Sequence, residues 1–447
     1  MTQDQFVYAL LDAARIAGIQ EAEIYYQQSD DFCALVYEGA ISDYRVNTHG
    51  GLSFRGLFNG RMGSAFTEAL DEDAILLLVQ GVLDGARLID TDDVETLFAG
   101  SANYPTLDCC AAQTDDTDAK LAFALELERL AKGVDARVNQ LGYTGLQTSC
   151  KTVRIVNTFG LDRSHTEDIA FALVQAVAQE GDRTTTGTGI SVGRCLSELS
   201  AEKAAHDAVE EAVSMLGAKP CQSGVMPVVI RRDAMSDLLE TFCGIFSAEE
   251  VQKGRSLMQE RVGKAIAASC VTLIDDPLMP HGLASCPFDA EGVATYQKTL
   301  IQNGVLQTLL HNRKTAAKDG VATTGNASRE GYGGGIHIAP TNLFLQPGRE
   351  DLDALCARIG DGLLLTEVSG LHAGANAISG DFSLLSKGFL LHNGCKTQPV
   401  EQITVAGNFY TLLRDITALG NDLWFGTNTC GCPSVSIKSL SIAGSIR

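Results

Sequence analysis

Residues 226–246, MPVVIRRDAMSDLLETFCGIF, begin as a strand and turn into a helix. One face of that helix is apolar and is formed by Met235, Leu238, Leu239, Phe242, Ile245 and Phe246. Glu240, Thr241 and Cys243 could carry chemistry, yet they lie among these large apolar residues. The stretch therefore predicts a strand that leads into a core helix, and any active site on it has to compete with packing.

The length and composition of the chain are those of a globular protein with more than one core. A chain of 447 residues is too long for a single hydrophobic core, so two domains are expected. Hydrophobic residues make up 45% and charged residues 20%, which is typical of soluble proteins. The 34 basic and 55 acidic residues give a net charge of −21. Because DNA binders need clustered basic residues to displace counterions, direct nucleic-acid binding is not expected.

The thirteen cysteines are scattered along the chain and include no Cys-x-x-Cys pair, which excludes a zinc ribbon or a thioredoxin motif. The N-terminal segment MTQDQFVYALLDAARIAG lacks the basic region of a signal peptide. The apolar run at 74–79 is too short to span a bilayer. We therefore expect a cytoplasmic protein with reduced thiols and no membrane segment.

Short β-prone segments separated by turn residues fill the first half of the chain. After an N-terminal helix, five short strands are predicted within residues 22–67, with Asn59-Gly60 as the strongest hairpin signal. A helix that starts at the acidic residues 71–73, a helix at 119–132, four strands within 138–192 and a helix at 201–216 follow. The segment GAKPCQSG, residues 217–224, has no periodicity and is predicted to be a linker.

Predicted strands also dominate the second half. Asn303-Gly304 indicates another hairpin, and Ser247 with Glu250 forms a capping-box pattern for a helix over 248–268. One further helix is predicted over 409–418. The overall prediction is an α+β fold in two domains. Residues 1–218 form an α+β domain with antiparallel sheets, and residues 219–447 form a β-rich domain with packed helices.

The residues that usually bind metals are poorly placed for it in this sequence. The two histidines closest in the sequence, His372 and His392, are too far apart to form a local metal motif. Cys430 and Cys432 are the weak candidates for a soft-metal site, since two thiolates without nearby histidines make an incomplete ligand set.

Two acidic pairs and a glycine cluster are further candidate sites. Asp275-Asp276 and the pair Asp289 and Glu291 adjoin turn residues, where carboxylates usually serve solvation or capping. The cluster EGYGGGIH, residues 330–337, lacks the Gly-Lys-Ser/Thr of a P-loop, so a mobile loop near a groove is the better prediction.

Several stretches of the second half resemble the TldD/PmbA family, whose members are also called modulators of DNA gyrase. They are HGLASCPFDAEGVAT (281–295), NRKTAAKDGVATTGNASRE (312–330), SGDFSLLSKGFLLHNG (379–394) and VEQITVAGNFYTLLRDITALGNDL (400–423). The N-terminal pattern IAGIQEAEIYY…GLSFRGLFNGRMGSAFT is similar as well. The resemblance covers nearly the whole chain.

The resemblance implies a comparison with the zinc-binding H-E-x-x-x-H helix of the TldD branch. Counted from the strand MPVVIRR, the two histidines and the catalytic glutamate of that motif fall on Glu240, Ile245 and Thr241, so none of them is present here. A histidine spacing of five separates the side chains by about 140° on an ideal helix, so such a helix is expected to distort locally. The cysteine that completes the zinc shell in that branch falls near Cys430 or Cys432, and the pattern does not choose between them.

The chain therefore resembles the TldE/PmbA branch, which lacks the zinc motif. The resemblance implies a catalytically silent subunit without a cofactor of its own. Its partner would be a TldD-type metallopeptidase that carries the zinc, and together they would act on unfolded peptides. Pairing of the chain with itself stays an alternative. Two rival functions stay open: a stand-alone hydrolase or peptidase that uses Glu240, Cys243 or the Cys430/Cys432 pair, and a regulator of DNA gyrase.

Overall fold

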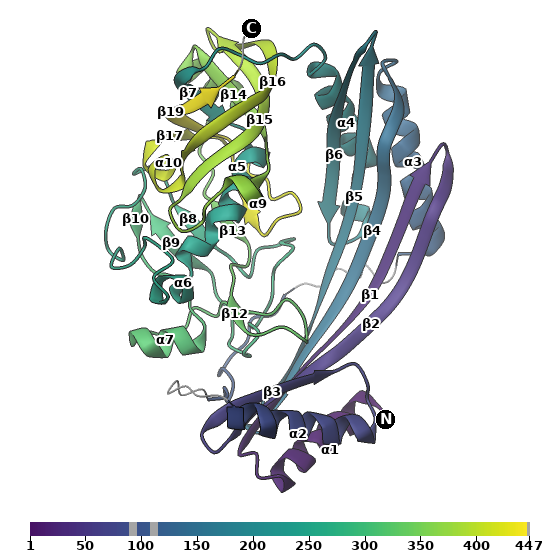
Figure 1. Ribbon diagram of the computed structural model, residues 1–447. Coiled ribbons are helices and arrows are strands. Elements are labelled where there is room, and N and C mark those ends of the chain that lie inside the picture. The colour runs from purple at the N-terminus through teal and green to yellow at the C-terminus, as the bar shows by residue number, and fades with distance from the viewer. Residues whose placement is uncertain (89–95, 108–114, 445–447) are drawn as a thin grey trace.

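The computed structural model describes residues 1–88, 96–107 and 115–444. Residues 21–193 contribute one long antiparallel sheet in the order β3-β2-β1-β4-β5-β6. Figure 1 shows its long strands running the height of the molecule beside the C-terminal half. The strands are β1 Glu21–Tyr37, β2 Ala40–Phe58, β3 Arg61–Thr67, β4 Val138–Asn157, β5 Asp162–Glu180 and β6 Arg183–Gly193.

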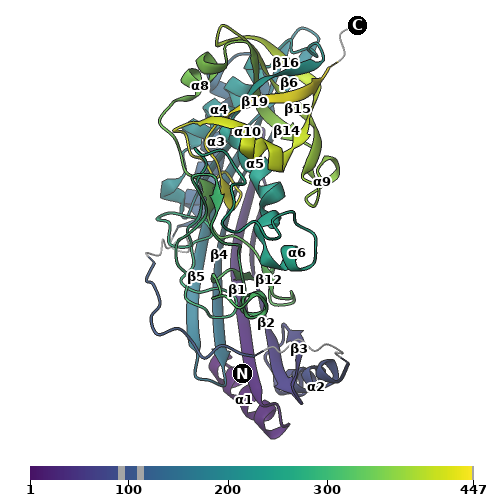
Figure 2. The same ribbon diagram turned by 90° about the vertical axis from the view of Figure 1, so that its left-hand side faces the viewer.

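The two faces of this sheet pack against different parts of the molecule, as the alternating direction of the side chains along β5 shows. The side chains of Ala172, Val174 and Ala176 are buried against the sheet's own helices, whereas His165 and Glu167 face the C-terminal half. The helices pack at the two ends of the sheet (Figure 2). They are α1 Gln3–Ile16 and α2 Glu72–Leu88 at one end, and α3 Thr117–Val134 and α4 Ala201–Ser214 at the other, with a 3-10 turn at Leu196–Glu198 before α4.

The prediction of many short strands in the first half was wrong, although the helices were correct. Five predicted strands merge into β1, β2 and β3, and the first two of the four later ones merge into β4. The polar centre of β1 had indicated a break, but its side chains find partners across the sheet. Asp30 accepts a hydrogen bond from Thr48 at 2.6 Å and Asp31 accepts one from Ser149 at 2.6 Å. The Asn59-Gly60 hairpin is confirmed, since both residues have positive φ, 50° and 77°, between paired strands.

The C-terminal half contains two further sheets built around α5. A six-stranded sheet has the order β16-β15-β14-β7-β19-β17, and a five-stranded sheet has the order β10-β9-β8-β13-β18. The first comprises β7 Gly224–Ile230, β14 Gly362–Ser369, β15 Asp381–His392, β16 Cys395–Asn408, β17 Ile416–Leu419 and β19 Val435–Ala443. The second comprises β8 Leu273–Asp275, β9 Lys298–Gln302, β10 Val305–Leu306, β13 Leu343–Leu345 and β18 Cys430–Gly431. A small pair, β11 Ala327–Ser328 and β12 His337–Ile338, lies apart from both.

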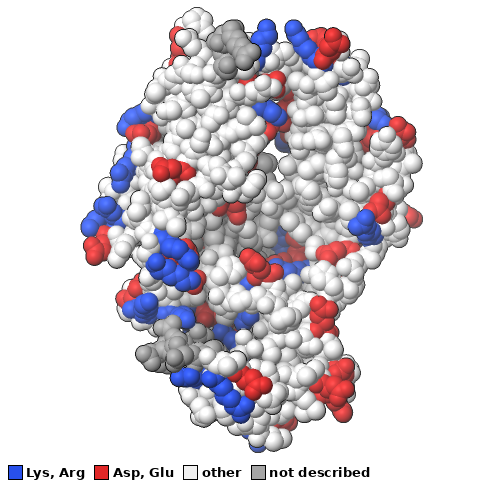
Figure 3. Space-filling model, in the orientation of Figure 1, with Lys and Arg blue, Asp and Glu red and all other residues white. Residues whose placement is uncertain are grey.

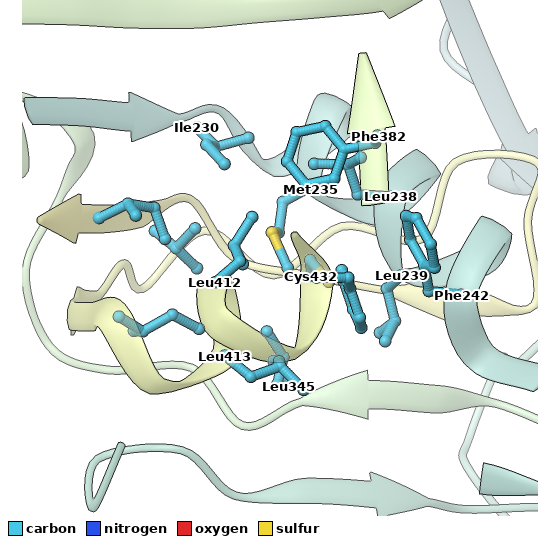
Figure 4. Packing of buried hydrophobic residues seen from close by; sticks show 14 of the residues in the cluster. Ile230, Met235, Leu238, Leu239, Phe242, Leu345, Phe382, Leu412, Leu413 and Cys432 are labelled. Atoms are coloured by element: carbon cyan, nitrogen blue, oxygen red, sulfur yellow. The ribbon is translucent and has the colours of Figure 1, made fainter. Parts of the chain in front are cut away.

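Helix α5, Arg232–Phe242, is buried between these sheets, as its apolar stripe predicted. Figure 4 shows its side chains packed with Ile230, Leu345 and Phe382. Phe242 stacks on Phe409 with ring centroids 4.7 Å apart. The remaining helices are α6 Ala248–Gln252, α7 Arg313–Asp319, α8 Leu352–Ile359, α9 Leu371–Gly374 and α10 Phe409–Asp415.

Two helix predictions in this half were too long. The helix predicted over 248–268 ends at Gln252, because Gly254 turns the chain with a φ of 70°, and the Ser247 side chain makes no capping hydrogen bond. The helix predicted over 409–418 ends at Asp415, where β17 begins to pair with β19. Within the described ranges, no helix has both the length and the apolar character needed to cross a membrane.

Candidate functional site

A cavity of about 560 Å³ lies between the long sheet and the C-terminal half. Strands β1, β4 and β5 form one wall, with Tyr25, Lys151 and Glu167 facing inward. The opposite wall includes the end of α5, the segment 427–429 and the small strands near residues 325–341. Figure 3 shows the surface hollowed between the two halves. The stretch MPVVIRRDAMSDLLETFCGIF therefore borders a cavity between the two halves of the molecule.

The end of α5 is a tight turn rather than a continuous helix. The α-helix stops at Phe242, and Cys243–Phe246 form a 3-10 turn. Gly244, exposed at the cavity, belongs to this turn. The change of winding places residue 240 on one element and residue 245 on the next, so side chains five apart do not follow the ideal helical spacing.

The three positions that the resemblance aligns with the zinc motif are not brought together as a site. The Glu240 carboxylate borders the cavity and accepts hydrogen bonds from the Cys430 backbone N–H at 3.1 Å and from the Thr429 hydroxyl at 3.2 Å. The Thr241 hydroxyl donates to the Asp237 carbonyl at 2.8 Å. Ile245 is only 1% exposed and lies in the main hydrophobic cluster. Each side chain thus has a structural partner of its own.

The two cysteine candidates differ in their surroundings. Cys432 lies in the hydrophobic core near Met235 and Leu412 (Figure 4). Cys430 lies beside Glu240 and Cys243, so it is the cysteine of the pair that adjoins the end of α5. Burial raises the pKa of both thiols, and Cys243 and Glu240 raise that of Cys430 further. Both are therefore protonated at neutral pH, whereas metals bind the thiolate.

These residues do not fit the zinc that the peptidase motif would hold. Glu240, Cys243 and Cys430 approach one another, but in the part of the chain that the structure describes no three His, Cys, Asp or Glu side chains are arranged to hold a metal ion. The Glu240 carboxylate is engaged by Thr429 and Cys430, and the core position of Ile245 offers no ligand atom. No step of a reaction is therefore assigned to a metal bound by this chain.

The sheet wall of the cavity carries a charged pair and an imidazole. Lys151 Nζ and Glu167 Oε2 are 2.6 Å apart. Burial opposes the charge on Lys151, but the Glu167 carboxylate outweighs it, so the pKa of Lys151 is raised. The His165 Nε2 lies 3.2 Å from the Ser285 carbonyl oxygen, and burial lowers the pKa of this imidazole. At neutral pH the wall thus presents an ion pair and a neutral ring that are fixed by the sheet.

Two carboxylates considered in the sequence, those of Asp275 and Asp289, are buried, and Asp289 lines the cavity. Asp275 was predicted to be a solvated turn residue, but it is fully buried and paired with Lys298 at 2.9 Å. Asp289 accepts hydrogen bonds from turn N–H groups, including Val293 at 3.0 Å, yet it is only 5% exposed. Burial, together with Glu291, raises the pKa of Asp289 to about 7. Capping is confirmed for Asp289, but the expected solvation was wrong, because turn residues signal local geometry and not what packs over the turn.

Comparisons with known proteins agree with this architecture. Three family models match the chain in order: the PmbA/TldA metallopeptidase domain 1 over residues 22–86, the central domain over 112–216 and the C-terminal domain over 223–444. These models describe a metallopeptidase-like class of proteins. The chain belongs to the PmbA/TldD family.

Individual relatives are similar over almost the full length. A "Metalloprotease PmbA" of Escherichia coli O157:H7 is 27% identical over 413 residues, which cover 91% of this chain and 88% of the relative. A "Metalloprotease TldD homolog" of Haemophilus influenzae is 23% identical, with 97% and 92% covered.

Solved structures share the same fold. A Thermotoga maritima protein described as a proposed modulator of a DNA gyrase is 33% identical, has a TM-score of 0.91, and matches over 99% of this chain and 100% of its own. TldE of Thermococcus kodakarensis is 23% identical and matches with a TM-score of 0.90 over 98% of this chain and 100% of its own. At that identity the second likeness concerns the fold alone.

Proposed function

We propose that this chain is a TldE/PmbA-like, catalytically silent subunit of a TldD-type metallopeptidase complex that processes or degrades unfolded peptides. The observation that carries the proposal is the end of α5. At the positions aligned with the zinc motif, the Glu240 carboxylate accepts a hydrogen bond from a backbone N–H, and the Thr241 hydroxyl donates one within its own helix. The third position, Ile245, lies in the hydrophobic core. Zinc and the water that it activates would come from the partner chain.

The cavity supports a role in holding peptide. Its volume of about 560 Å³ suits a few residues of extended chain, and its walls combine apolar side chains with the fixed Lys151–Glu167 pair. Tyr25 on the sheet wall and Phe288 on the opposite side offer aromatic surface. In the complex these residues would bind and orient an unfolded segment, while the partner supplies the reacting groups.

A cytoplasmic location is part of the proposal. All eleven cysteines in the described ranges are free, which suits a reducing compartment. The net charge of −21 disfavours binding to nucleic acid and is consistent with a protein that acts on other polypeptide chains.

Affinity capture tests the partnership most simply. The tagged chain is expressed at its natural level in its own cell, and the proteins that elute with it are identified by mass spectrometry. We expect a second family member with an intact H-E-x-x-x-H motif, in a one-to-one complex by light scattering. A complex that contains only copies of this chain would contradict the heteromeric assembly and favour a homodimer.

The rival functions make different predictions in two further assays. A stand-alone hydrolase would cleave peptides without a partner and would lose that activity when Cys243, which faces the cavity, is changed to serine. A gyrase regulator would change the rate of DNA supercoiling by purified gyrase. We expect no effect of the isolated chain in either assay.

A further inference from the structure

A second, larger cavity of about 1110 Å³ adjoins the first one. Arg329 lines both cavities and so marks their junction. Strands β2 and β3 of the long sheet form one side of the second cavity, and α6, α7 and the glycine cluster at 333–335 form the other. The glycine cluster was predicted to lie near a groove, and it does.

The lining of this cavity is basic although the chain is acidic. Among the described residues it contains two carboxylates, those of Glu249 and Glu291. It contains six cationic side chains, which are Arg55, Lys253, Arg313, Lys314, Lys318 and Arg329. Blue side chains are visible around α6 and α7 in Figure 3. Because the net charge of the chain is −21, this concentration of positive charge is a local feature with its own attraction for anions.

Carboxylates within the chain balance Arg55 and Lys253. Arg55 is paired with the buried Glu23 at 2.7 Å, and Lys253 is paired with Glu249 at 2.5 Å. The charges of these two side chains are therefore largely compensated.

Arg329 and Arg313 are satisfied differently, through neutral oxygens. The Arg329 Nη1 donates to the Gly334 carbonyl at 3.1 Å and to the Ser53 hydroxyl at 3.3 Å, and its buried Nε has no hydrogen-bond partner. The Arg313 guanidinium donates to the carbonyl and the hydroxyl of Thr96. Glu291 lies near both guanidinium groups, but neither is hydrogen-bonded through its side chain to a carboxylate of the described residues, so both can still accept a carboxylate as a direct partner.

We propose that the second cavity binds an acidic segment of a peptide, with Arg329 at the junction and Arg313 and Lys318 on the wall attracting its carboxylates. The volume exceeds what a single small anion requires, and apolar side chains such as Phe66 and Ile336 share the lining. A long polyanion such as DNA would meet the negative surface beyond the cavity, whereas a short acidic peptide fits inside it. Binding of an acidic peptide does not depend on the proposed function. Only the fate of the bound peptide, its processing or degradation by the complex, rests on that proposal.

Binding of labelled peptides to the isolated chain tests this assignment without a partner. A glutamate-rich unfolded peptide of about ten residues is compared, by fluorescence anisotropy, with the same peptide carrying glutamine at every glutamate. We expect the glutamate form to bind tighter and to weaken as salt is raised, because screening reduces attraction between charges. Equal affinities for the two peptides would overturn the proposal.

Three variants locate the binding. Lys318→Glu changes an exposed side chain, and we expect it to weaken the glutamate peptide about five- to tenfold while leaving the glutamine peptide unchanged. Arg329→Gln should act in the same direction. Lys264→Glu, a matched change of an exposed lysine outside both cavities, should have no such effect.

Two results would contradict the placement. One is a Lys318→Glu variant that keeps its thermal melt and binds the glutamate peptide as the unmodified chain does. The other is a single-stranded oligonucleotide that displaces the peptide at lower concentration than the free glutamate peptide does, since the site would then favour nucleic acid. These assays contain no partner chain. Their failure would therefore contradict the acidic-peptide site alone, whereas failure of partner capture would contradict the proposed complex.

Discussion

Glu240 and Cys430 are 190 positions apart in the sequence, and the Cys430 backbone N–H donates a hydrogen bond to the Glu240 carboxylate at 3.1 Å. The contact links the end of α5 to β18 at the border of the first cavity. A carboxylate that accepts a backbone N–H in this way supports the fold. The resemblance to the TldD branch aligns Glu240 with the first histidine of the zinc motif.

Replacing this carboxylate should therefore lower stability. Glu240→Ala leaves the Cys430 N–H and the Thr429 hydroxyl without their acceptor, and we expect a loss of about 1–3 kcal/mol in the free energy of unfolding. Glu240→Gln keeps one acceptor oxygen and should cost less. Urea unfolding measures both, and an alanine variant with an unchanged midpoint would show that the contact does not contribute.

The core position of Ile245 predicts a larger effect. Ile245→Asp places a carboxylate where the side chain is 1% exposed, and burying an unpaired charge costs several kcal/mol or prevents folding. The control Ile245→Val removes one methyl group and should cost about 0.5–1.5 kcal/mol. A stable, soluble Ile245→Asp protein would mean that this side chain faces the cavity instead of the core.

Asp289 should make stability depend on pH. Its pKa is about 7 in the folded chain, against about 3.9 for an aspartate in an unfolded chain. Because the folded state holds the proton more tightly, the contribution of Asp289 to the free energy of unfolding should be largest below about pH 4 and should be lost as the pH rises to about 7, by an amount on the order of 4 kcal/mol.

The variant Asp289→Asn should remove most of this fall, because residue 289 no longer titrates. Glu291, whose pKa burial also raises, should keep part of the slope. Asp353→Asn, a change of an exposed aspartate on α8, is the control and should leave the slope as it is. Urea midpoints are measured between pH 4 and 8 for the unmodified chain and the two variants. The same dependence of the midpoint on pH in all three proteins would contradict a raised pKa for Asp289.

Thiol labelling should separate the exposed from the buried cysteines. Cys395 is exposed, whereas Cys430 and Cys432 are fully buried and burial raises the pKa of their thiols. With iodoacetamide at pH 8, we expect Cys395 to be modified in the native protein and the other two only after unfolding. Rapid native labelling of Cys430 would indicate an accessible thiolate beside the cavity, as the stand-alone hydrolase requires.

Local sequence signals predicted local structure correctly. The Asn59-Gly60 and Asn303-Gly304 pairs both adopt positive φ in tight hairpins, and the apolar stripe of α5 does face the core. The lengths of strands were harder to predict, because polar side chains such as Asp31 break the apolar pattern. Their partners, such as Ser149, are more than a hundred residues away.

The site could be placed from the sequence only in part. Periodicity identified the helix, and the resemblance identified Glu240, Thr241 and Ile245, but neither predicted that the helix tightens after Phe242. Nor could they show that the sheet of the first half closes the cavity with Lys151 and Glu167. Those features depend on how distant segments pack, which no local pattern encodes.

Reconstitution of peptidase activity tests the central claim most directly. The purified chain and the captured partner are assayed separately and together on an unfolded peptide. We predict cleavage only by the complex, loss of cleavage when the glutamate of the partner's zinc motif is changed to glutamine, and full cleavage when this chain carries Cys243→Ser. Cleavage by this chain alone that disappears with Cys243→Ser would contradict the account.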